Sequence, residues 1–243
     1  MINHAEITRV MQAKERPGIG IHPNPYADEQ PEWNRRKKFF SERSLLTKKI
    51  ESLMEPRFIT TPEISEMIEA LIVMTDSRKI LEVGMCTGFT SMHILRAIIG
   101  KKGACLVSVD ARPMLDREFF SHFPIFRFLE GWSQDVLTGL YPQDFDLVFV
   151  DSDHSLEHTQ KEFEALKLIT HKGTVFLFHD VPLRNRPDAT EAPPVRQWLE
   201  SMNKSGELTG VCIQSCQQAD CLLMWGDGYP KECNPGLGIF VRT

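Results

Sequence analysis

A glycine-rich bend and an acid beyond the next apolar run have the residue types needed to bind a nucleoside. The bend extends from Glu82 to Gly88, and its two glycines, Gly84 and Gly88, permit a tight turn and close backbone approach to a ligand. The next apolar run ends at Asp110, whose carboxylate can accept hydrogen bonds from both hydroxyls of a ribose. The spacing is G-x-x-x-G rather than the G-x-G-x-x-G of dinucleotide enzymes, and Glu82 would repel a pyrophosphate. S-Adenosylmethionine, which carries a ribose and an ammonium group but no phosphate, therefore fits these residues better.

A third apolar run is followed by the segment Gly131-Trp132-Ser133-Gln134-Asp135. Its small and polar groups could reach the edge of an adenine. Trp132 could stack on a ligand, and it could equally be an anchor in the core.

Two further apolar runs end in groups that could form a reacting centre. Asp151 and His154 follow one run, and His179 and Asp180 follow the other. If the two runs are neighbouring parallel strands, Asp151, His179 and Asp180 could converge on one divalent cation such as Mg or Mn, which would lower the pKa of an acceptor hydroxyl. His154 could act as a general base, because a histidine titrates near neutral pH. The alternatives are a solvent-exposed residue at a helix start for His154 and a structural hydrogen-bonded pair for His179 and Asp180.

The elements that must position these residues alternate between strands and helices. Helical periodicity and capping signals predict helices over 89–99, 155–169 and 194–202. Short apolar runs predict strands over 79–83, 105–109, 125–129, 145–150 and 174–178, with further candidates at 208–213, 222–225 and 237–241. This order predicts an α/β fold with a doubly wound, mostly parallel seven-stranded sheet that is covered by helices on both faces.

The N-terminal region differs from the rest of the chain. Residues 1–56 are predicted to form an irregular arm and a helical lid with a helix over 33–53, and residues 57–243 are predicted to form the cofactor-binding domain. The lid helix could close over the site or pack in a homodimer. A second helix is predicted to begin at Pro62, with an apolar stripe of Ile64, Met67, Ile68, Leu71 and Ile72.

Composition narrows the range of partners. The formal net charge of -5 argues against nucleic-acid binding. The sequence shows no apolar run long enough for a bilayer and no secretory signal, so we expect a cytoplasmic protein that does not bind membranes. Four of the six cysteines gather near the C-terminus with irregular spacings, which favours reduced thiols over a zinc site.

Five segments resemble the class I S-adenosylmethionine-dependent methyltransferases: ILEVGMCTGFTS, VSVDARP, EGWSQDVL, LVFVDSDHS and GTVFLFHD. Within that class the chain is similar to the cation-dependent O-methyltransferases of the catechol and caffeoyl-CoA type, and to a bacterial branch that reads D-x-D-H-S. The resemblance implies that Glu82, Gly84 and Thr90 hold the methionine part of the cofactor, that Asp110 holds the ribose, and that Ser133 and Gln134 lie at the adenine. The complete set of residues expected to bind the cofactor is Glu82, Gly84, Cys86, Gly88, Thr90, Asp110, Ala111, Trp132, Ser133, Gln134 and Asp151.

The reacting centre departs from the pattern of the cation-dependent enzymes. Those enzymes read D-x-x-K and then D-N, whereas this chain reads D-x-x-H and then H-D. Asp151 matches their first metal carboxylate, and His154 stands where they have a lysine base. The expected activity is methyl transfer to a hydroxyl of a small-molecule acceptor, with Asp151 and His154 as catalytic residues. The alternatives are a metal-independent methyltransferase, a non-catalytic nucleoside-binding protein and, least favoured, a nicotinamide oxidoreductase.

Overall fold

The computed structural model describes residues 30–53, 62–112, 114–140, 144–182, 191–214 and 236–243. The chain divides into two units, residues 1–40 and 41–243. The described part of the first unit is the beginning of helix α2 (Gln30–Leu53), and all other elements belong to the second. The predicted domain boundary after residue 56 lies outside the described residues.

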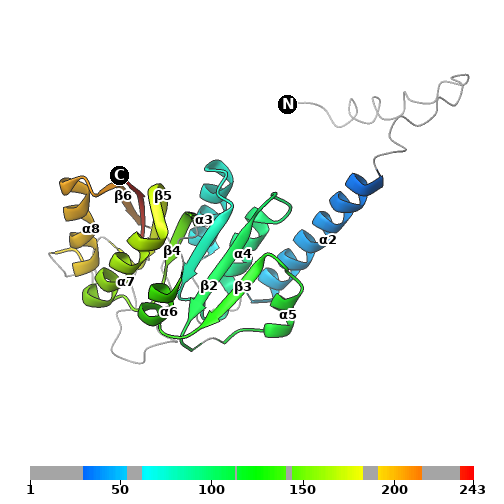
Figure 1. The fold of residues 1–243 in the computed structure, drawn as a ribbon, viewed down its shortest axis with the longest axis horizontal. Helices are drawn as coiled ribbons and strands as arrows, with labels where there is room; N and C mark the ends of the chain where they lie inside the picture. The colour runs from blue at the N-terminus through cyan, green and yellow to red at the C-terminus, as the bar shows by residue number, and fades with distance from the viewer. Residues whose placement is uncertain (1–29, 54–61, 113, 141–143, 183–190, 215–235) are drawn as a thin grey trace, which may run out of the picture. The chain divides into compact units, whose positions relative to one another are not determined.

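Seven strands form one sheet in the order β3-β2-β1-β4-β5-β7-β6 (Figure 1). The first five strands are parallel, and β7 lies antiparallel between β5 and β6. This arrangement confirms the predicted fold class. The strands are β1 (Lys79–Val83), β2 (Cys105–Asp110), β3 (Phe126–Glu130), β4 (Phe145–Val150), β5 (Thr170–His179), β6 (Leu208–Gln214) and β7 (Gly236–Arg242).

Helices cover both faces of this sheet. Helix α3 (Pro62–Met74) packs against α4 (Phe89–Ile98), and on the opposite face α7 (Leu156–Ile169) packs against α6 (Ser133–Gly139) and α8 (Pro194–Ser205), as Figure 1 shows. The short helix α5 (Arg117–Ser121) precedes β3. Because the central strand β4 is covered on both sides, its sequence is apolar except for Asp146.

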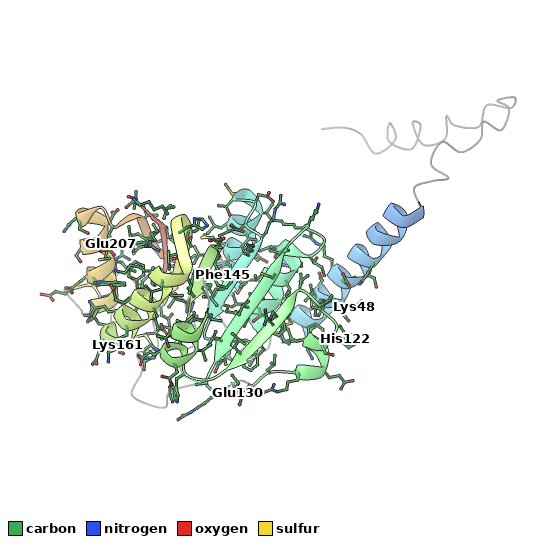
Figure 2. All side chains as sticks on the ribbon, viewed as in Figure 1. Lys48, His122, Glu130, Phe145, Lys161 and Glu207 are labelled. Carbon is green, nitrogen blue, oxygen red and sulfur yellow. The ribbon has the colours of Figure 1, made fainter. Side chains whose placement is uncertain are left out.

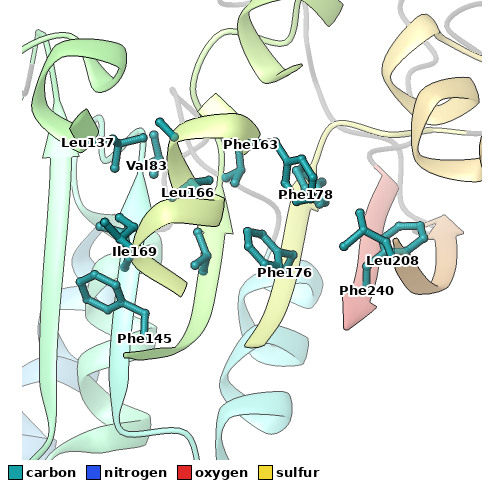
Figure 3. Packing of buried hydrophobic residues seen from close by; sticks show 14 of the residues in the cluster. Val83, Leu137, Phe145, Phe163, Leu166, Ile169, Phe176, Phe178, Leu208 and Phe240 are labelled. Carbon is teal, nitrogen blue, oxygen red and sulfur yellow. The ribbon is translucent and has the colours of Figure 1, made fainter. Parts of the chain in front are cut away.

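The core on the α7 face is rich in aromatic side chains (Figure 3). The ring of Phe163 on α7 lies 5.4 Å from Phe176 on β5 and 5.4 Å from Trp198 on α8, both nearly edge-on. Figure 2 shows Phe145 inside the domain and Lys161 and Glu207 at its periphery, in keeping with their burial. This packing holds the ends of β4 and β5 in fixed positions relative to α7.

Local signals in the sequence set several helix ends. Helix α3 begins at Pro62 as predicted. Helix α7 is capped by Ser155, whose hydroxyl accepts the His158 N–H at 3.4 Å. Helix α8 ends at Gly206, which has a left-handed φ of 80°.

Some predictions need correction. Helices α5 and α6 were not predicted, because five and seven residues are too few to show a helical period. Strand β5 begins at Thr170, four residues before the predicted start. Met67 is 37% exposed, unlike its buried neighbours in the stripe, Ile64 and Ile68. The strand candidate 222–225 lies outside the described residues.

Within the described part of the chain, no helix combines the length and the apolar character that crossing a membrane requires.

Candidate functional site

The glycine-rich bend leaves β1 at Gly84 and passes close to the end of β4. Gly84 has a φ of 90°, and a Cβ atom at this position would lie 2.0 Å from the backbone carbonyl oxygen of Asp151. The neighbouring strand therefore leaves no space for a side chain here. Gly84 is required both for its backbone conformation and for this close approach.

Asp110, at the end of β2, holds the bend in shape. Its Oδ2 accepts the backbone N–H groups of Met85 and Cys86, each at 2.8 Å, and its Oδ1 accepts the N–H of Arg112 at 2.7 Å. Cys86 has a φ of 50°, in the left-handed region that non-glycine residues rarely adopt. The carboxylate predicted to hold a ribose therefore also fixes the backbone around the ligand position, and the ribose contact itself stays a prediction.

Glu82 lies beneath the bend rather than at its surface. Its side chain is fully buried, and its Oε2 accepts the hydroxyls of Ser91 and Ser108, each at 2.5 Å. Burial raises the pKa of Glu82 to about 8, against the effect of the two hydroxyls and with help from the charges of Asp151 and Asp110. Its Oε1 has no hydrogen-bond partner among the described residues. Contact between Glu82 and a ligand stays a prediction.

The bend ends where α4 begins. Gly88 has a φ of 81°, and a Cβ atom here would lie 2.6 Å from the ring of Phe120. Helix α4 has no side-chain cap at Gly88, and Thr90 in its first turn is buried. Gly88 and Thr90 thus lie at the same edge of the sheet as Gly84 and Asp110.

The segment after β3 forms the next side of the site. Trp132 is 56% exposed and is therefore not a core anchor, and the Arg112 guanidinium lies 5.7 Å from the centre of its ring. Ala111, next to Asp110, is half-buried. The hydroxyl of buried Ser133 donates to Glu162 on α7, and the Gln134 Nε2 lies 3.2 Å from the Nδ1 of His158.

Glu162 is the centre of a buried network that sequence reasoning missed. Besides Ser133, it accepts the Ser152 hydroxyl at 2.7 and 2.8 Å and pairs with the His158 Nε2 at 2.9 Å. A signal was present, because Glu162 falls on the buried stripe of α7 between Thr159 and Phe163. An acid on an apolar stripe indicates a specific buried partner.

The four residues predicted for the reacting centre lie together. The Nε2 of His154 is 3.3 Å from Asp180 Oδ2 and 3.9 Å from Asp151 Oδ1. The Nδ1 of His179 is 2.9 Å from Asp151 Oδ1 and 3.3 Å from Asp180 Oδ1. His154, His179 and Asp180 line a hollow of about 10 Å³, the size of one water molecule.

The charges in this cluster support one another. Burial disfavours the charged form of His179, but the carboxylates of Asp151 and Asp180 outweigh it and raise the pKa of His179 to about 9. Burial also acts to raise the pKa of Asp180, yet His179 and His154 lower it below its usual value. His179 is therefore charged and Asp180 ionised at neutral pH.

The predicted metal ligands fit a cation poorly as they are arranged. The described residues include no group of three or more His, Cys, Asp or Glu side chains positioned to hold one ion. The metal set Asp151, His179 and Asp180 therefore stays a prediction.

Residues 81–181 match the family model described as a methyltransferase domain, and this range includes the bend, Asp110, Gln134 and the reacting cluster. The chain thus contains a methyltransferase domain. A protein of Mycobacterium sp. (strain KMS) with the name "Putative O-methyltransferase" is 27% identical over 165 residues, which cover 63% of this chain and 73% of that protein. A Mycolicibacterium smegmatis protein of similar name is also 27% identical over 165 residues, which cover 63% of this chain and 77% of that protein.

Solved structures share the fold of this methyltransferase. The O-methyltransferase from Bacillus cereus in complex with SAH has a TM-score of 0.60 and 20% identity, over 84% of this chain and 91% of that chain. The O-methyltransferase TomG from Streptomyces achromogenes, in complex with SAM, has a TM-score of 0.55 and 21% identity, over 88% and 99% of the two chains. The predicted membership of the class I, S-adenosylmethionine-dependent methyltransferases is confirmed.

Proposed function

We propose that this methyltransferase transfers the methyl group of S-adenosylmethionine to a hydroxyl oxygen of a small-molecule acceptor. The observation that carries the proposal is that the braced bend and the His154–Asp180 pair lie at one edge of the sheet, beyond the ends of β1, β2, β4 and β5. The O-methyltransferase names of the relatives support transfer to oxygen.

The residues at the bend fit a nucleoside with a charged methionine tail. Gly84 lets the bend pass close to the end of β4, where no side chain fits, and Asp110 keeps lone pairs for ribose hydroxyls beyond the three N–H groups it accepts. Trp132 offers an exposed ring at the same edge. When bound, S-adenosylmethionine supplies a methyl group on a sulfonium, which leaves as a neutral thioether once the methyl is transferred.

The proposed base is His154. The Nε2 of His154 lies 3.3 Å from the ionised Asp180. A proton on Nε2 would face this carboxylate and leave the lone pair on Nδ1 to take a proton from the acceptor. As the acceptor oxygen bonds to the methyl carbon, the bond from that carbon to sulfur breaks, and the hydroxyl proton moves to the His154 Nδ1. The charged His179 holds Asp151 and Asp180 in place below this base.

No step in this scheme uses a metal, because His154 takes the hydroxyl proton directly. We therefore expect the rate of methyl transfer to survive EDTA. A rate that EDTA abolishes and Mn2+ restores would support the metal-assisted alternative and remove the proposed base from its role. The homodimer and the cytoplasmic location expected from the sequence stay predictions.

The first test is calorimetry with S-adenosylhomocysteine, followed by assay of S-adenosylhomocysteine release with a panel of hydroxylated small molecules. The protein is expected to bind S-adenosylhomocysteine and not NAD, and the release of S-adenosylhomocysteine in the assay should depend on the acceptor. Binding of NAD alone would overturn the proposal.

The second test concerns the base. His154→Asn should lower kcat by roughly a hundred-fold or more with little change in the affinity for S-adenosylhomocysteine, because general bases contribute about this much. His171→Asn, at an exposed histidine of the same domain, is the control and should leave kcat unchanged. An unchanged kcat in His154→Asn would argue that positioning alone drives the reaction.

A further inference from the structure

The helices on the α4 face of the sheet enclose a second cavity, separate from the site at the strand ends. Its volume is about 200 Å³, and a cavity of about 150 Å³ is already large enough to hold benzene. Helix α2 contributes Ile50 and Glu51 to its lining, α3 contributes Glu66, and α4 contributes Phe89, His93 and Arg96. Among the described residues that line it, none belongs to the proposed methyl-donor site or to the reacting centre.

His93 gives this cavity a buried polar atom without a partner. The residue is 2% exposed, and its Nδ1 lies 3.4 Å from Glu69 Oε2 and 3.3 Å from Arg96 Nη2. Its other ring nitrogen, Nε2, is buried and has no hydrogen-bond partner among the described residues. A buried nitrogen in this state is unfavourable until something binds to it. A hydroxyl group would suit either tautomer of His93, because a hydroxyl can both donate and accept.

Arg96 also lines the cavity, but its positive charge is balanced by Glu69. The guanidinium donates to both carboxylate oxygens of Glu69 at 2.5–3.0 Å, and exposed Arg43 lies 3.6 Å from the same carboxylate. Burial acts to raise the pKa of Glu69, but the contacts with His93 and Arg96 outweigh it and lower the pKa to about 2. Glu69 is therefore ionised at neutral pH and offsets the charge of Arg96 next to the cavity.

The remaining lining groups are two carboxylates and an apolar surface. Glu51 and Glu66 are exposed, and neither forms an ion pair with another described residue. Ile50 is 4% exposed and Phe89 is 2% exposed, so the apolar surface lies deeper than the carboxylates. The cavity thus offers negative charge at its mouth, an apolar wall, and the unpartnered nitrogen of His93 at depth.

We propose that this cavity is a second small-molecule site, which takes an organic ammonium ion with an apolar body and a hydroxyl group. The hydroxyl binds the Nε2 of His93, the body packs against Phe89 and Ile50, and the ammonium group lies at Glu51 and Glu66. The inference does not depend on the proposed methyl transfer, because binding here needs neither the methyl donor nor the acceptor.

Helix packing alone does not require these features. A structural role for His93 needs only Nδ1, which reaches Glu69 and Arg96. Protein interiors are close-packed, so three helices that served only to cover the sheet would be expected to fill a space of this size with apolar side chains. A structural role also makes no demand on the chemistry of a ligand, and ligand preference therefore separates the two accounts.

The test is an NMR titration of the amide signals of the full chain, without S-adenosylhomocysteine, with three ligands of matched shape. The first is p-(aminomethyl)benzyl alcohol, the second is p-methylbenzylamine, which lacks the hydroxyl, and the third is p-(hydroxymethyl)benzyl alcohol, which lacks the ammonium. The first should bind about ten-fold more tightly than the second, because the second leaves Nε2 unpaired, and about five-fold more tightly than the third. The shifted signals should lie in residues 47–51 and 89–96.

The variants assign each preference to its residues. In the double variant Glu51→Gln with Glu66→Gln, the preference for the ammonium ligand over the third ligand should fall to about two-fold or less. In His93→Phe the preference for the hydroxyl ligand over the second ligand should fall to about two-fold or less. Glu164→Gln, at an exposed glutamate of α7, and His171→Phe, at an exposed histidine, are the matched controls and should keep the wild-type ratios.

Each outcome decides the matter. The inference would be overturned if the first ligand caused no shifts at about 10 mM, which would leave the cavity to water, or if the three ligands bound equally. Shifts confined to the strand-end site around His154 and His179 would also overturn it. If His93→Phe failed to fold, the ligand ratios of the wild type and of the exposed glutamate variants would still decide. Binding of S-adenosylhomocysteine is measured separately, so the proposed function stands or fails independently of these results.

Discussion

Replacing Glu82 by glutamine should remove a pH dependence that this carboxyl group imposes on folding. Glu82 is fully buried, and its pKa is raised from 4.5 to about 8, mainly by burial. The folded protein therefore binds one more proton than the unfolded chain between these two pH values. The free energy of unfolding contains a contribution from Glu82 that is fully present below about pH 4.5 and is lost as the pH rises toward 8.

The size of this effect follows from the shift. Each unit of pKa difference corresponds to about 1.4 kcal/mol, so the full range is worth about 5 kcal/mol, and the interval from pH 5 to pH 7.5 is worth about 3 kcal/mol. The glutamine side chain in Glu82→Gln would have no proton to lose. It would keep a carbonyl oxygen for the hydroxyls of Ser91 and Ser108, with its amide nitrogen where the Oε1 of Glu82 has no partner.

Urea unfolding of the ligand-free protein measures this directly. The stability of Glu82→Gln relative to wild type should increase by about 3 kcal/mol between pH 5 and pH 7.5, and all other titrating groups cancel because both proteins share them. Glu66→Gln, at an exposed glutamate of α3, should run parallel to wild type. Parallel profiles for Glu82→Gln and wild type would refute the reasoning, because they would mean that the carboxyl group ionises in the folded protein as it does in the unfolded chain.

Three further predictions concern the bend and the core. Gly84→Ala should lower the free energy of unfolding by about 3 kcal/mol or more, because its Cβ would lie 2.0 Å from a backbone carbonyl oxygen. Gly206→Ala, at a glycine with a similar φ and open space around it, should lower it by about 1–2 kcal/mol. Equal losses of stability in urea unfolding would contradict this reasoning. Phe163→Ala should cost about 3–5 kcal/mol because the ring is fully buried, and Leu168→Ala, which is 71% exposed, should cost under about 0.5 kcal/mol in thermal or urea unfolding. Asp110→Asn turns one accepting oxygen into a donor that faces a backbone N–H. The free energy of unfolding should therefore fall by about 1–3 kcal/mol, and the calorimetric affinity for S-adenosylhomocysteine should fall as well. If neither quantity changed, the result would argue against the bracing role of Asp110.

The geometry also changes how variants of Asp110 must be interpreted. Asp110→Ala would remove the contact to a ribose and the three backbone hydrogen bonds that shape the bend at the same time. Loss of binding in that variant alone would not separate these causes. Comparison of S-adenosylhomocysteine with its 2′-deoxy analogue does so, because only a direct contact to the ribose makes the loss in Asp110→Ala smaller for the deoxy ligand.

Much of this fold could be predicted from the sequence because its signals are local. The apolar run 145–150 has the composition of a strand buried on both faces, and Ser155 caps the helix that follows it. Helices α5 and α6 could not be predicted, because elements this short have no period and are held by their neighbours. The burial of Glu162 was visible only as an acid on an apolar stripe.

The sequence by itself determined the order of the strands and of the longer helices, the positions of the polar residues at the strand ends, and the resemblance to methyltransferases. These follow from hydrophobic periodicity and from motifs within single segments. The tertiary structure decided what each polar side chain faces: Glu82 turns inward to two serines, Asp110 braces the bend, and His158 reaches Gln134 through space. These pairings join residues up to 26 positions apart along the chain, and they exist only once the packing of the sheet and helices has brought those segments together.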